Sequence, residues 1–219
     1  MNVLELFAGS RLIGRNAEAL GCEVFSVDWQ KFEGINLSID IGKLKQSDIP
    51  FIPDFVWASP DCTTYTIAAI SHHRNGIEPK TDYAKKCDAV NQHFIALIGD
   101  YLKLNPDMVF FIENPRGMMR KMPFIRNFKR HTVWYCTYGD DRAKPTDIFT
   151  NSTAWMPRKQ CHNGNLACHH QPAPRGAKTG TQGKKGSYNR SKIPNELCIE
   201  ILESALGVPT KNIYQIQLF

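Results

Sequence analysis

Short hydrophobic runs alternate along the first 150 residues with segments that have helical spacing. The predicted strands, in chain order, are Met1–Phe7, Glu23–Val27, Ile35–Asp40, Asp54–Ala58, Met108–Ile112, Thr132–Tyr138 and Asp147–Thr150. Apolar residues recur every three or four positions in Leu12–Leu20 and Tyr83–Leu102, which predicts two amphipathic helices. Strands that alternate with helices favour an α/β fold with a mostly parallel sheet and helices on both faces.

The alternating pattern stops after residue 150 and resumes as an amphipathic segment at Ile193–Leu206. We therefore expect a catalytic and cofactor-binding α/β domain at 1–150 and a C-terminal helix at 191–219 that returns to it. The intervening segment, 151–190, is rich in Cys, His, Lys and Gly. It is predicted to be a short insert and a candidate minimal target-recognition region.

The chain of 219 residues has 27 Lys and Arg against 21 Asp and Glu, a formal net charge of +6. This balance favours a polyanionic partner, and the basic residues gather in 116–130 and 175–192, as along a substrate groove. An alternative interpretation is two solvated surface loops. The candidate nucleic-acid contacts are Arg116, Lys121, Arg175, Lys184 and Lys185.

Neither a membrane-spanning run nor a signal peptide is expected, because Glu5 interrupts the apolar start of the chain. The seven cysteines are an odd and scattered set, which argues against a secreted disulfide scaffold. The sequence thus predicts a soluble protein of a reducing compartment, the cytoplasm of a bacterial or phage-infected cell. It indicates no obligate protein partner.

Candidate ligand-binding residues stand where the first three predicted strands end. The turn Phe7-Ala8-Gly9 lets the backbone approach a ligand closely, and Asp28 and Asp40 offer carboxylates to ribose hydroxyls and to an adenine amine. The turn lacks a full G-x-G-x-x-G pattern, which favours a nucleoside-type cofactor over a dinucleotide. The alternative is a plain connecting turn with solvent-facing acids.

Five short motifs resemble, in their order and spacing, those of the DNA cytosine-C5 methyltransferase family, over nearly the whole chain. They are Leu4–Gly9 (LELFAG), Asp54–Cys62 (DFVWASPDC), Phe111–Pro115 (FIENP), Tyr138–Lys144 (YGDDRAK) and Ser191–Pro194 (SKIP). The resemblance implies a Rossmann-like S-adenosylmethionine-dependent methyltransferase fold. It also implies transfer of a methyl group to C5 of cytosine in DNA, double-stranded in the first instance, with the target base flipped out of the helix.

The resemblance also implies roles for individual residues. Cys62 is the expected nucleophile, which adds to cytosine C6 so that C5 can attack the methyl group. Glu113 is expected to contact cytosine N3 and the 4-amino group, with Arg142 and Lys144 as further catalytic residues. The implied cofactor contacts are Phe7, Ala8, Gly9, Asp28, Asp40 and Pro60.

The sequence departs from the family pattern around the nucleophile and in the length of the target-recognition region, which is far shorter here. Asp61 replaces a proline before Cys62, and Thr63 replaces a glutamine after it. A carboxylate at position 61 raises the pKa of the neighbouring thiol. Arg142 or Lys144 would offset that effect if the fold brings either one close.

Five potential metal ligands lie within ten residues of the insert, in Cys161-His162 and Cys168-His169-His170. Cys161, Cys168 and His169 are the candidate zinc ligands, because a short loop without its own core gains stability from a metal. The alternative is a set of exposed polar residues in a DNA-contacting loop.

Three other functions remain open at this point. Ser59-Pro60-Asp61-Cys62 partly echoes the loop of exocyclic amino methyltransferases, which stack the target base on an aromatic side chain, and Tyr65 lies three residues beyond Cys62. An RNA cytosine is a second possible acceptor. A methyltransferase fold that binds nucleic acid without turnover is the third.

Overall fold

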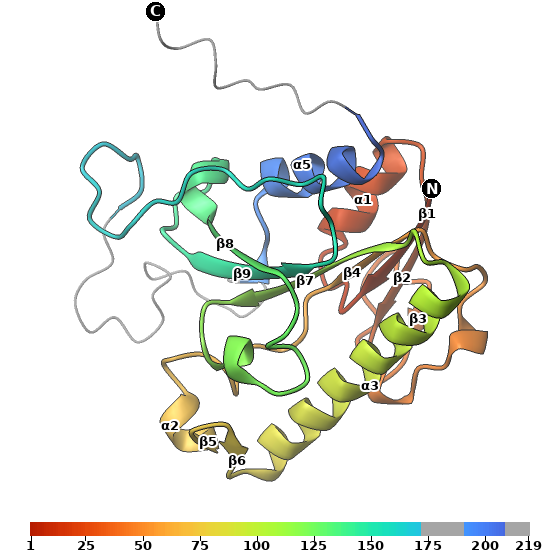
Figure 1. Ribbon diagram of the computed structural model, residues 1–219, viewed down its shortest axis with the longest axis horizontal. Helices are drawn as coiled ribbons and strands as arrows, with labels where there is room; N and C mark the ends of the chain where they lie inside the picture. Colours follow the sequence, from red (N-terminus) through yellow and green to blue (C-terminus); the bar gives the residue numbers. More distant parts are fainter. Residues whose placement is uncertain (172–190, 209–219) are drawn as a thin grey trace, which may run out of the picture.

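The computed structural model describes residues 1–171 and 191–208 (Figure 1). A seven-stranded sheet in the order β3-β2-β1-β4-β7-β9-β8 forms its centre, and a two-stranded hairpin, β5-β6, stands apart. The strands are β1 Asn2–Leu6, β2 Glu23–Asp28, β3 Leu37–Ser38, β4 Phe55–Ala58, β5 Arg74–Asn75, β6 Glu78–Pro79, β7 Val109–Pro115, β8 Arg130–Trp134 and β9 Pro145–Thr150. The α-helices are α1 Leu12–Ala19, α2 Ile70–His73, α3 Asp82–Leu104 and α5 Asn195–Ala205. The 3₁₀ turns are η1 Ile41–Lys43, η2 Gln46–Asp48, η3 Met118–Lys121 and η4 Tyr135–Tyr138.

Strands β1, β2, β3, β4 and β7 run parallel, whereas β9 is antiparallel to both of its neighbours, β7 and β8. The chain winds outward from β1 to β3 and then returns to build the other half of the sheet from β4. The order of strands therefore reverses between β1 and β4, and in such sheets ligands bind outside the carboxyl ends of the strands at that point. The expected Rossmann-like, mostly parallel fold is confirmed.

The side chains of each central strand alternate between two hydrophobic cores, because successive residues of a strand point to opposite faces of the sheet. Leu4, Leu6 and Val56 pack on the face that α3 covers. Val3 and Phe55 pack on the opposite face, with α1 and α5. Figure 1 shows α1 and α5 above the sheet and α3 below it. Helices thus cover both faces, as the pattern predicts.

Two predicted strands are shorter than expected. The third ends early because the Asp40 carboxylate caps η1 and accepts a 3.1 Å hydrogen bond from the Gly42 amide, which turns the chain. The predicted strand Thr132–Tyr138 ends at Trp134, where its partner in β9 is Pro145. Proline has no N–H to continue the ladder, and the chain proceeds as the 3₁₀ turn η4.

Residues 151–171 contain no helix or strand and lie against the α/β part of the fold. Trp155 is buried and donates a 3.1 Å hydrogen bond to Glu200 of α5, and Arg158 pairs with Glu196 and Glu200 of the same helix. In Figure 1 this segment runs from the end of β9 past α5 and η4. The predicted target-recognition role of 151–190 stays a prediction, and residues 172–190 lie outside the described part of the chain.

Helix α5 confirms the helix expected near the C-terminus, and it packs beside α1 on one face of the sheet. Within 1–171 and 191–208, no helix combines the length and the apolar character needed to cross a membrane.

Candidate active site

A cavity of about 1680 Å³ opens at the carboxyl ends of β1, β2, β4 and β7. Its wall includes all six predicted cofactor contacts and three of the four predicted catalytic residues. These are Phe7, Ala8, Gly9, Asp28, Asp40, Pro60, Cys62, Glu113 and Lys144. Pockets for a single drug-sized ligand measure about 300–1,000 Å³, so this cavity has room for a cofactor and a base together.

A tight turn after β1 forms one wall of the cavity. Phe7, Gly9 and Arg11 have φ angles of 56°, 48° and 53°, in the left-handed region that is costly for residues other than glycine. Such backbone persists where the surroundings hold it, often at a functional site. Here the Gly9 amide donates a 2.9 Å hydrogen bond to Asp28, and the Phe7 ring packs edge-on against Phe94 at 5.3 Å.

The two acids at the strand ends keep acceptor capacity for a ligand. Asp28 accepts from the amides of Gly9 and Gln30, at 2.9 Å each, which leaves some of the lone pairs of its carboxylate. The Lys86 ammonium, 3.0 Å from the Asp40 carboxylate, lowers the pKa of Asp40. Both acids are therefore set up as anionic hydrogen-bond acceptors.

Glu5, which stands within the Leu4–Gly9 motif but has no predicted role of its own, also lines the cavity. It is buried, accepts from the Gly14 amide at 3.1 Å and from the Ser26 hydroxyl at 2.7 Å, and so joins β1, α1 and β2. Burial raises its pKa to about 7, against the lowering effect of these hydrogen bonds. No sequence motif marks this contact, because its partners lie nine and twenty-one residues away.

Cys62 lies on the loop after β4, between groups of opposite charge. Burial raises the pKa of its thiol to about 11, the Lys144 ammonium lowers it, and Glu113 and Asp61 raise it. Asp61 accepts hydrogen bonds from the Thr63 amide at 2.6 Å and from the Tyr83 hydroxyl. Of the two cations predicted to offset Asp61, the structure places Lys144 near the thiol.

Glu113, near the end of β7, is buried beside the Cys62 thiol. The Lys144 ammonium lies close to both groups. The Glu113 carboxylate accepts a 2.8 Å hydrogen bond from the Tyr135 hydroxyl and lies 3.7 Å from the Lys144 ammonium. The Lys144 ammonium also stands 4.6 Å from the centre of the Tyr135 ring. A thiol, a carboxyl group and a cation thus meet on one side of the cavity.

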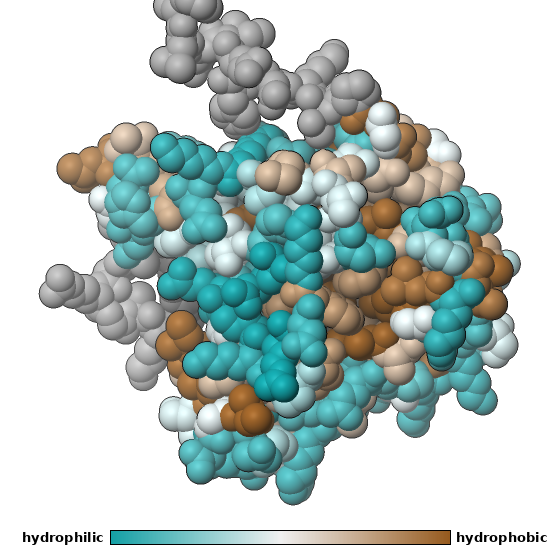
Figure 2. Space-filling view, in the orientation of Figure 1, coloured by the Kyte–Doolittle hydropathy of each residue, from teal (hydrophilic) through white to brown (hydrophobic). Residues whose placement is uncertain are grey.

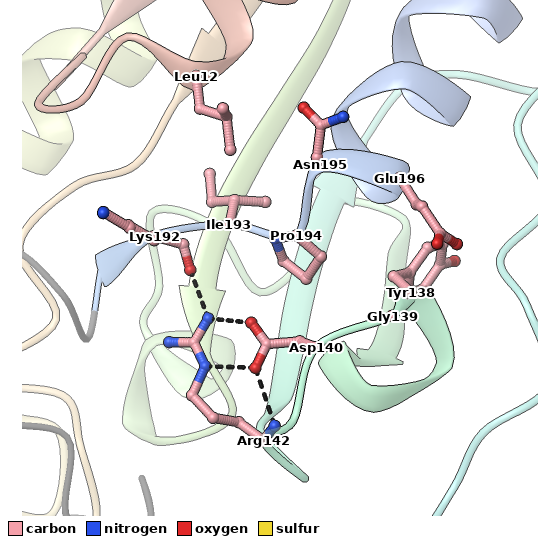
Figure 3. A pocket seen from close by; sticks show the side chains of 10 residues that line it. All are labelled: Leu12, Tyr138, Gly139, Asp140, Arg142, Lys192, Ile193, Pro194, Asn195 and Glu196. Carbon is pink, nitrogen blue, oxygen red and sulfur yellow. Dashed lines mark hydrogen bonds and ion pairs between the residues drawn. The ribbon is translucent and has the colours of Figure 1, made fainter. Parts of the chain in front are cut away.

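Arg142 lies apart from that group, in a smaller cavity of about 750 Å³ between η4 and the start of α5 (Figure 3). Its guanidinium pairs with Asp140 and donates a 2.8 Å hydrogen bond to the Lys192 carbonyl. It also lies over the Tyr135 ring, at 5.3 Å. Tyr135 thus contacts both Arg142 and Glu113, and the predicted catalytic role of Arg142 stays a prediction.

The loop that follows Cys62 is clamped to α3 by a buried ionic network. Arg74 donates to the Thr64 carbonyl at 2.9 Å and pairs with Asp88 of α3 at 2.6 Å. The Tyr65 hydroxyl donates to the same carboxylate at 2.6 Å and accepts from Asn91 at 2.7 Å. Tyr65 is fully buried, so its ring forms part of the support of the loop.

A second set of contacts joins the Cys62 loop to the end of β7. The Asn114 side chain donates a 3.2 Å hydrogen bond to the Pro60 carbonyl, and the Met118 amide donates to the Tyr65 carbonyl at 2.7 Å. A Cβ atom on Gly117 would lie 2.3 Å from that Tyr65 oxygen. Only glycine permits this approach, which sets the distance between the Cys62 and Glu113 loops.

Of the predicted nucleic-acid contacts, Arg116 is exposed and lines the large cavity, and Lys121 is exposed on η3. Nearby Arg120 instead forms a bidentate pair with Asp147, and Lys129 donates to the Ser152 carbonyl. Figure 2 shows hydrophilic residues over β8, β9 and η3 on this face of the molecule. The other candidates, Arg175, Lys184 and Lys185, lie outside the described residues.

Two of the three predicted zinc ligands come together, with two different partners. Cys161 and Cys168 lie with Cys136 and His170, and the four potential ligand atoms are within 4.8 Å of one another. His169 points elsewhere and shares a 2.9 Å hydrogen bond with the Asp140 carbonyl.

No family model matches the sequence, and no curated protein matches it. Among solved structures, a chain described as a DNA modification methyltransferase encoded within an E. coli prophage aligns with a TM-score of 0.49 and 14% identity, over 74% of this chain and 52% of the other. A variant of Spodoptera frugiperda DNMT2 aligns at 0.47 and 23% identity, over 74% and 53%. S. pombe Dnmt2 methyltransferase aligns at 0.45 and 13% identity, over 73% and 52%. The chain thus spans about half the length of these structures.

Proposed function

We propose that this protein transfers a methyl group from S-adenosylmethionine to C5 of cytosine in DNA. The observation that carries the proposal is one cavity that holds Cys62, Glu113 and Lys144 beside the Phe7–Gly9 turn and Asp28. The sequence motifs suggest these residues separately, and they lie on five different strand ends or loops. Their meeting in one cavity supports a shared reaction.

The residues of the cavity fit a nucleoside-type cofactor. Asp28 and Asp40 offer anionic acceptors to a ribose and an adenine amine, while Phe7, Ile41 and Val90 give the same end of the cavity apolar walls. Mixed apolar walls with a few placed polar groups are typical of cofactor sites. When bound, S-adenosylmethionine supplies an electrophilic methyl group.

On the acceptor side, the Cys62 thiol gives its proton to the Glu113 carboxylate beside it and adds through its sulfur to C6 of the cytosine ring. Glu113 then donates this proton to N3 as the electron pair of the C5–C6 bond moves, and C5 becomes nucleophilic. After C5 has received the methyl group, a water molecule takes the C5 proton, N3 returns its proton to Glu113, and departure of the Cys62 thiolate restores the aromatic ring. Lys144 stabilises the thiolate at the beginning and the end of this sequence.

The position of Tyr65 favours methylation at C5 over methylation of an exocyclic amine. The amino-directed chemistry stacks the target base on an aromatic side chain of the loop. In this protein Tyr65 is fully buried in the network with Asp88, and Cys62 is among the loop residues that line the cavity.

The sequence motifs imply DNA as the acceptor, and the basic chain, with Arg116 exposed at the cavity and Lys121 exposed on η3, supports a nucleic acid in that role. Phosphate contacts of this kind position the nucleic acid and offset the few kcal/mol needed to flip a base out of a duplex.

The test is incubation of the protein with methyl-labelled S-adenosylmethionine and unmethylated double-stranded DNA, followed by mass spectrometry of the nucleosides. Parallel reactions contain RNA in place of DNA, Cys62→Ser, or the matched control Cys22→Ser, whose thiol is buried outside the cavity. A second assay uses DNA with 5-fluorocytosine, because fluorine at C5 is not released as a proton and the adduct with Cys62 persists.

Labelled 5-methylcytosine that disappears in Cys62→Ser and remains in Cys22→Ser would support the proposal. Label on an exocyclic amine, or activity that survives Cys62→Ser, would move the assignment to the amino-directed class. Label in RNA alone would change the acceptor. Cofactor binding without any transfer would favour a nucleic-acid-binding module.

A further inference from the structure

A cluster of three thiols and an imidazole lies outside the cavity described above. Cys136 belongs to η4, whereas Cys161, Cys168 and His170 belong to the segment that follows β9. Their four potential ligand atoms are all within 4.8 Å of one another. The chain therefore brings together groups separated by 34 residues in sequence, from Cys136 to His170.

The spacing of these atoms is close to that of a zinc coordination shell. With Zn–S of about 2.3 Å and Zn–N of about 2.0–2.1 Å, tetrahedral ligand atoms lie roughly 3.6–3.8 Å apart. The Cys161 sulfur and the His170 Nδ1 are 3.8 Å apart. The remaining pairs reach this geometry by an inward shift of about 1 Å or less.

The four side chains of the cluster are available to bind a metal ion. All seven cysteines of the chain are free thiols, and Cys136 is buried. His170 is also buried, and its Nε2 has no hydrogen-bond partner within residues 1–171 and 191–208. Imidazole nitrogen is a common zinc ligand, and the Nδ1 atom that faces the Cys161 sulfur is the one suited to ligation.

Trp155 and Arg158 fasten the first part of the segment to α5, and the three ligands lie in the part that follows them. Leu166 is 98% exposed and Met156 is 72% exposed, so the segment has no hydrophobic core of its own at these positions. The Asn165 side chain donates a 3.4 Å hydrogen bond to the Cys161 sulfur, as outer-shell groups do to thiolate ligands. A metal bound by four residues would supply the missing cross-link.

We propose that Cys136, Cys161, Cys168 and His170 bind one structural Zn²⁺ ion, which fastens the segment after β9 to η4. Four protein ligands leave no open position for water or substrate, so the ion takes no part in the reaction. Three thiolates and one imidazole in a tetrahedral arrangement select zinc over the hard cations Mg²⁺ and Ca²⁺. The inference does not depend on the proposed function, since none of the four residues lines the cavity around Cys62.

The experiment measures zinc in the purified full chain, together with Cys168→Ser, His170→Ala and the matched control Cys22→Ser. We expect about one zinc per chain in the wild type and in Cys22→Ser, and a loss to near zero in Cys168→Ser and His170→Ala. Wild-type protein without zinc after growth and purification in zinc-containing medium would overturn the proposal. Zinc that stays stoichiometric in both ligand variants would overturn it as well.

X-ray absorption at the zinc edge keeps the test valid if the ligand variants fail to fold, because it uses the wild-type protein. A first shell of three sulfurs and one nitrogen is expected. A shell made only of oxygen and nitrogen, or a non-reducing mass spectrum with a disulfide between two of Cys136, Cys161 and Cys168, would contradict the assignment.

Discussion

At the scale of single residues, the reactivity of Cys62 depends on two neighbours of opposite charge. Burial raises the pKa of the thiol to about 11 even though Lys144 lowers it, and Glu113 and Asp61 each raise it further. Lys144→Gln should therefore raise the pKa of Cys62, and Asp61→Asn should lower it, each on the order of one unit. The rate of alkylation of Cys62 by iodoacetamide, followed by peptide mass spectrometry between pH 7 and 11, measures both shifts.

The wild-type alkylation rate should keep rising with pH up to about pH 11, since only the thiolate reacts. At pH 8 it should be slower in Lys144→Gln and faster in Asp61→Asn. A plateau below pH 8 in the wild type, or shifts of the same sign in both variants, would show that these charges do not control the thiol.

Gly117 tests how closely the loops that carry Cys62 and Glu113 must approach. A Cβ atom there would lie 2.3 Å from the Tyr65 carbonyl oxygen, which is backbone and has little freedom to move away. Gly117→Ala should cost about 1–3 kcal/mol of unfolding free energy. It should also lower kcat by about 10²-fold, because the reacting groups separate by a fraction of an ångström or more.

The control for Gly117→Ala is Gly99→Ala in α3, where an added Cβ meets no atom within 4 Å. That change should stabilise the helix by about 0.5–1 kcal/mol and leave kcat unchanged. Urea unfolding and steady-state methylation distinguish the two. Equal behaviour of the two variants would mean that the contact between Gly117 and Tyr65 has no role in the site.

The sequence identifies the residues at the ends of strands more reliably than those on irregular segments. Cys62, Asp28 and Glu113 follow or end strands whose hydrophobic pattern is clear, and parallel strands direct such residues to one edge of the sheet. No comparable pattern distinguishes Arg142 from Lys144, or His169 from His170. In these segments the backbone turns at each residue, so adjacent side chains point to different partners.

At the scale of secondary-structure elements, one buried network fixes the Cys62 loop to α3. Asp88 of α3 pairs with Arg74 and accepts from Tyr65, and the Arg74 side chain is fully buried. Asp88→Ala would leave an uncompensated buried charge, at a cost of about 3–5 kcal/mol. For a chain of this size the melting temperature should fall by roughly 6–20 °C.

Asp100→Ala is the matched control, because Asp100 also lies in α3 and pairs with a cation, Lys103, at the exposed surface. Exposed pairs contribute about 0–1 kcal/mol, so its melting temperature should stay close to that of the wild type. Differential scanning calorimetry measures both. A small shift for Asp88→Ala would mean that the Arg74 charge finds water or another partner.

The main elements are predictable from the sequence because their hydrophobic period matches burial on one or both faces. Helix α3 and strands β1, β2 and β4 all lie within two residues of the predicted bounds. The sequence does not predict the hairpin β5-β6, because each of its strands has only two residues and its position depends on the contacts of Arg74. The sequence does not predict the 3₁₀ turn η4 either. Pro145 ends the hydrogen-bond ladder opposite Trp134, and only the strand pairing reveals that these two residues are opposite each other.

At the scale of the whole molecule, the large cavity lies at one of the two ends of the sheet. The cavity, Arg116 and Lys121 lie at or near the carboxyl ends of the parallel strands. At the opposite end, Asn105 just after α3 contacts Asp54 at the start of β4, with Lys103 close by in the helix. DNA that reaches Cys62 must therefore approach from the first end.

This polarity predicts the salt dependence of DNA binding. Each lysine that neutralises a phosphate contributes about one unit to the slope of log K against log salt concentration. Lys121→Ala should reduce that slope by about one and weaken binding to all DNA sequences alike, because a phosphate contact carries no sequence information. Fluorescence anisotropy of a labelled duplex at several salt concentrations gives the slope for each variant.

Lys103→Ala removes the same charge from the opposite end of the sheet and serves as the control. If only net charge mattered, both variants would weaken binding equally and neither would alter the slope by a full unit. An unchanged slope in Lys103→Ala together with a reduced slope in Lys121→Ala would place phosphates at η3, beside the cavity. The reverse result would direct DNA to the end of the sheet that lacks Cys62, and the proposed reaction at that thiol could not then take place on a bound duplex.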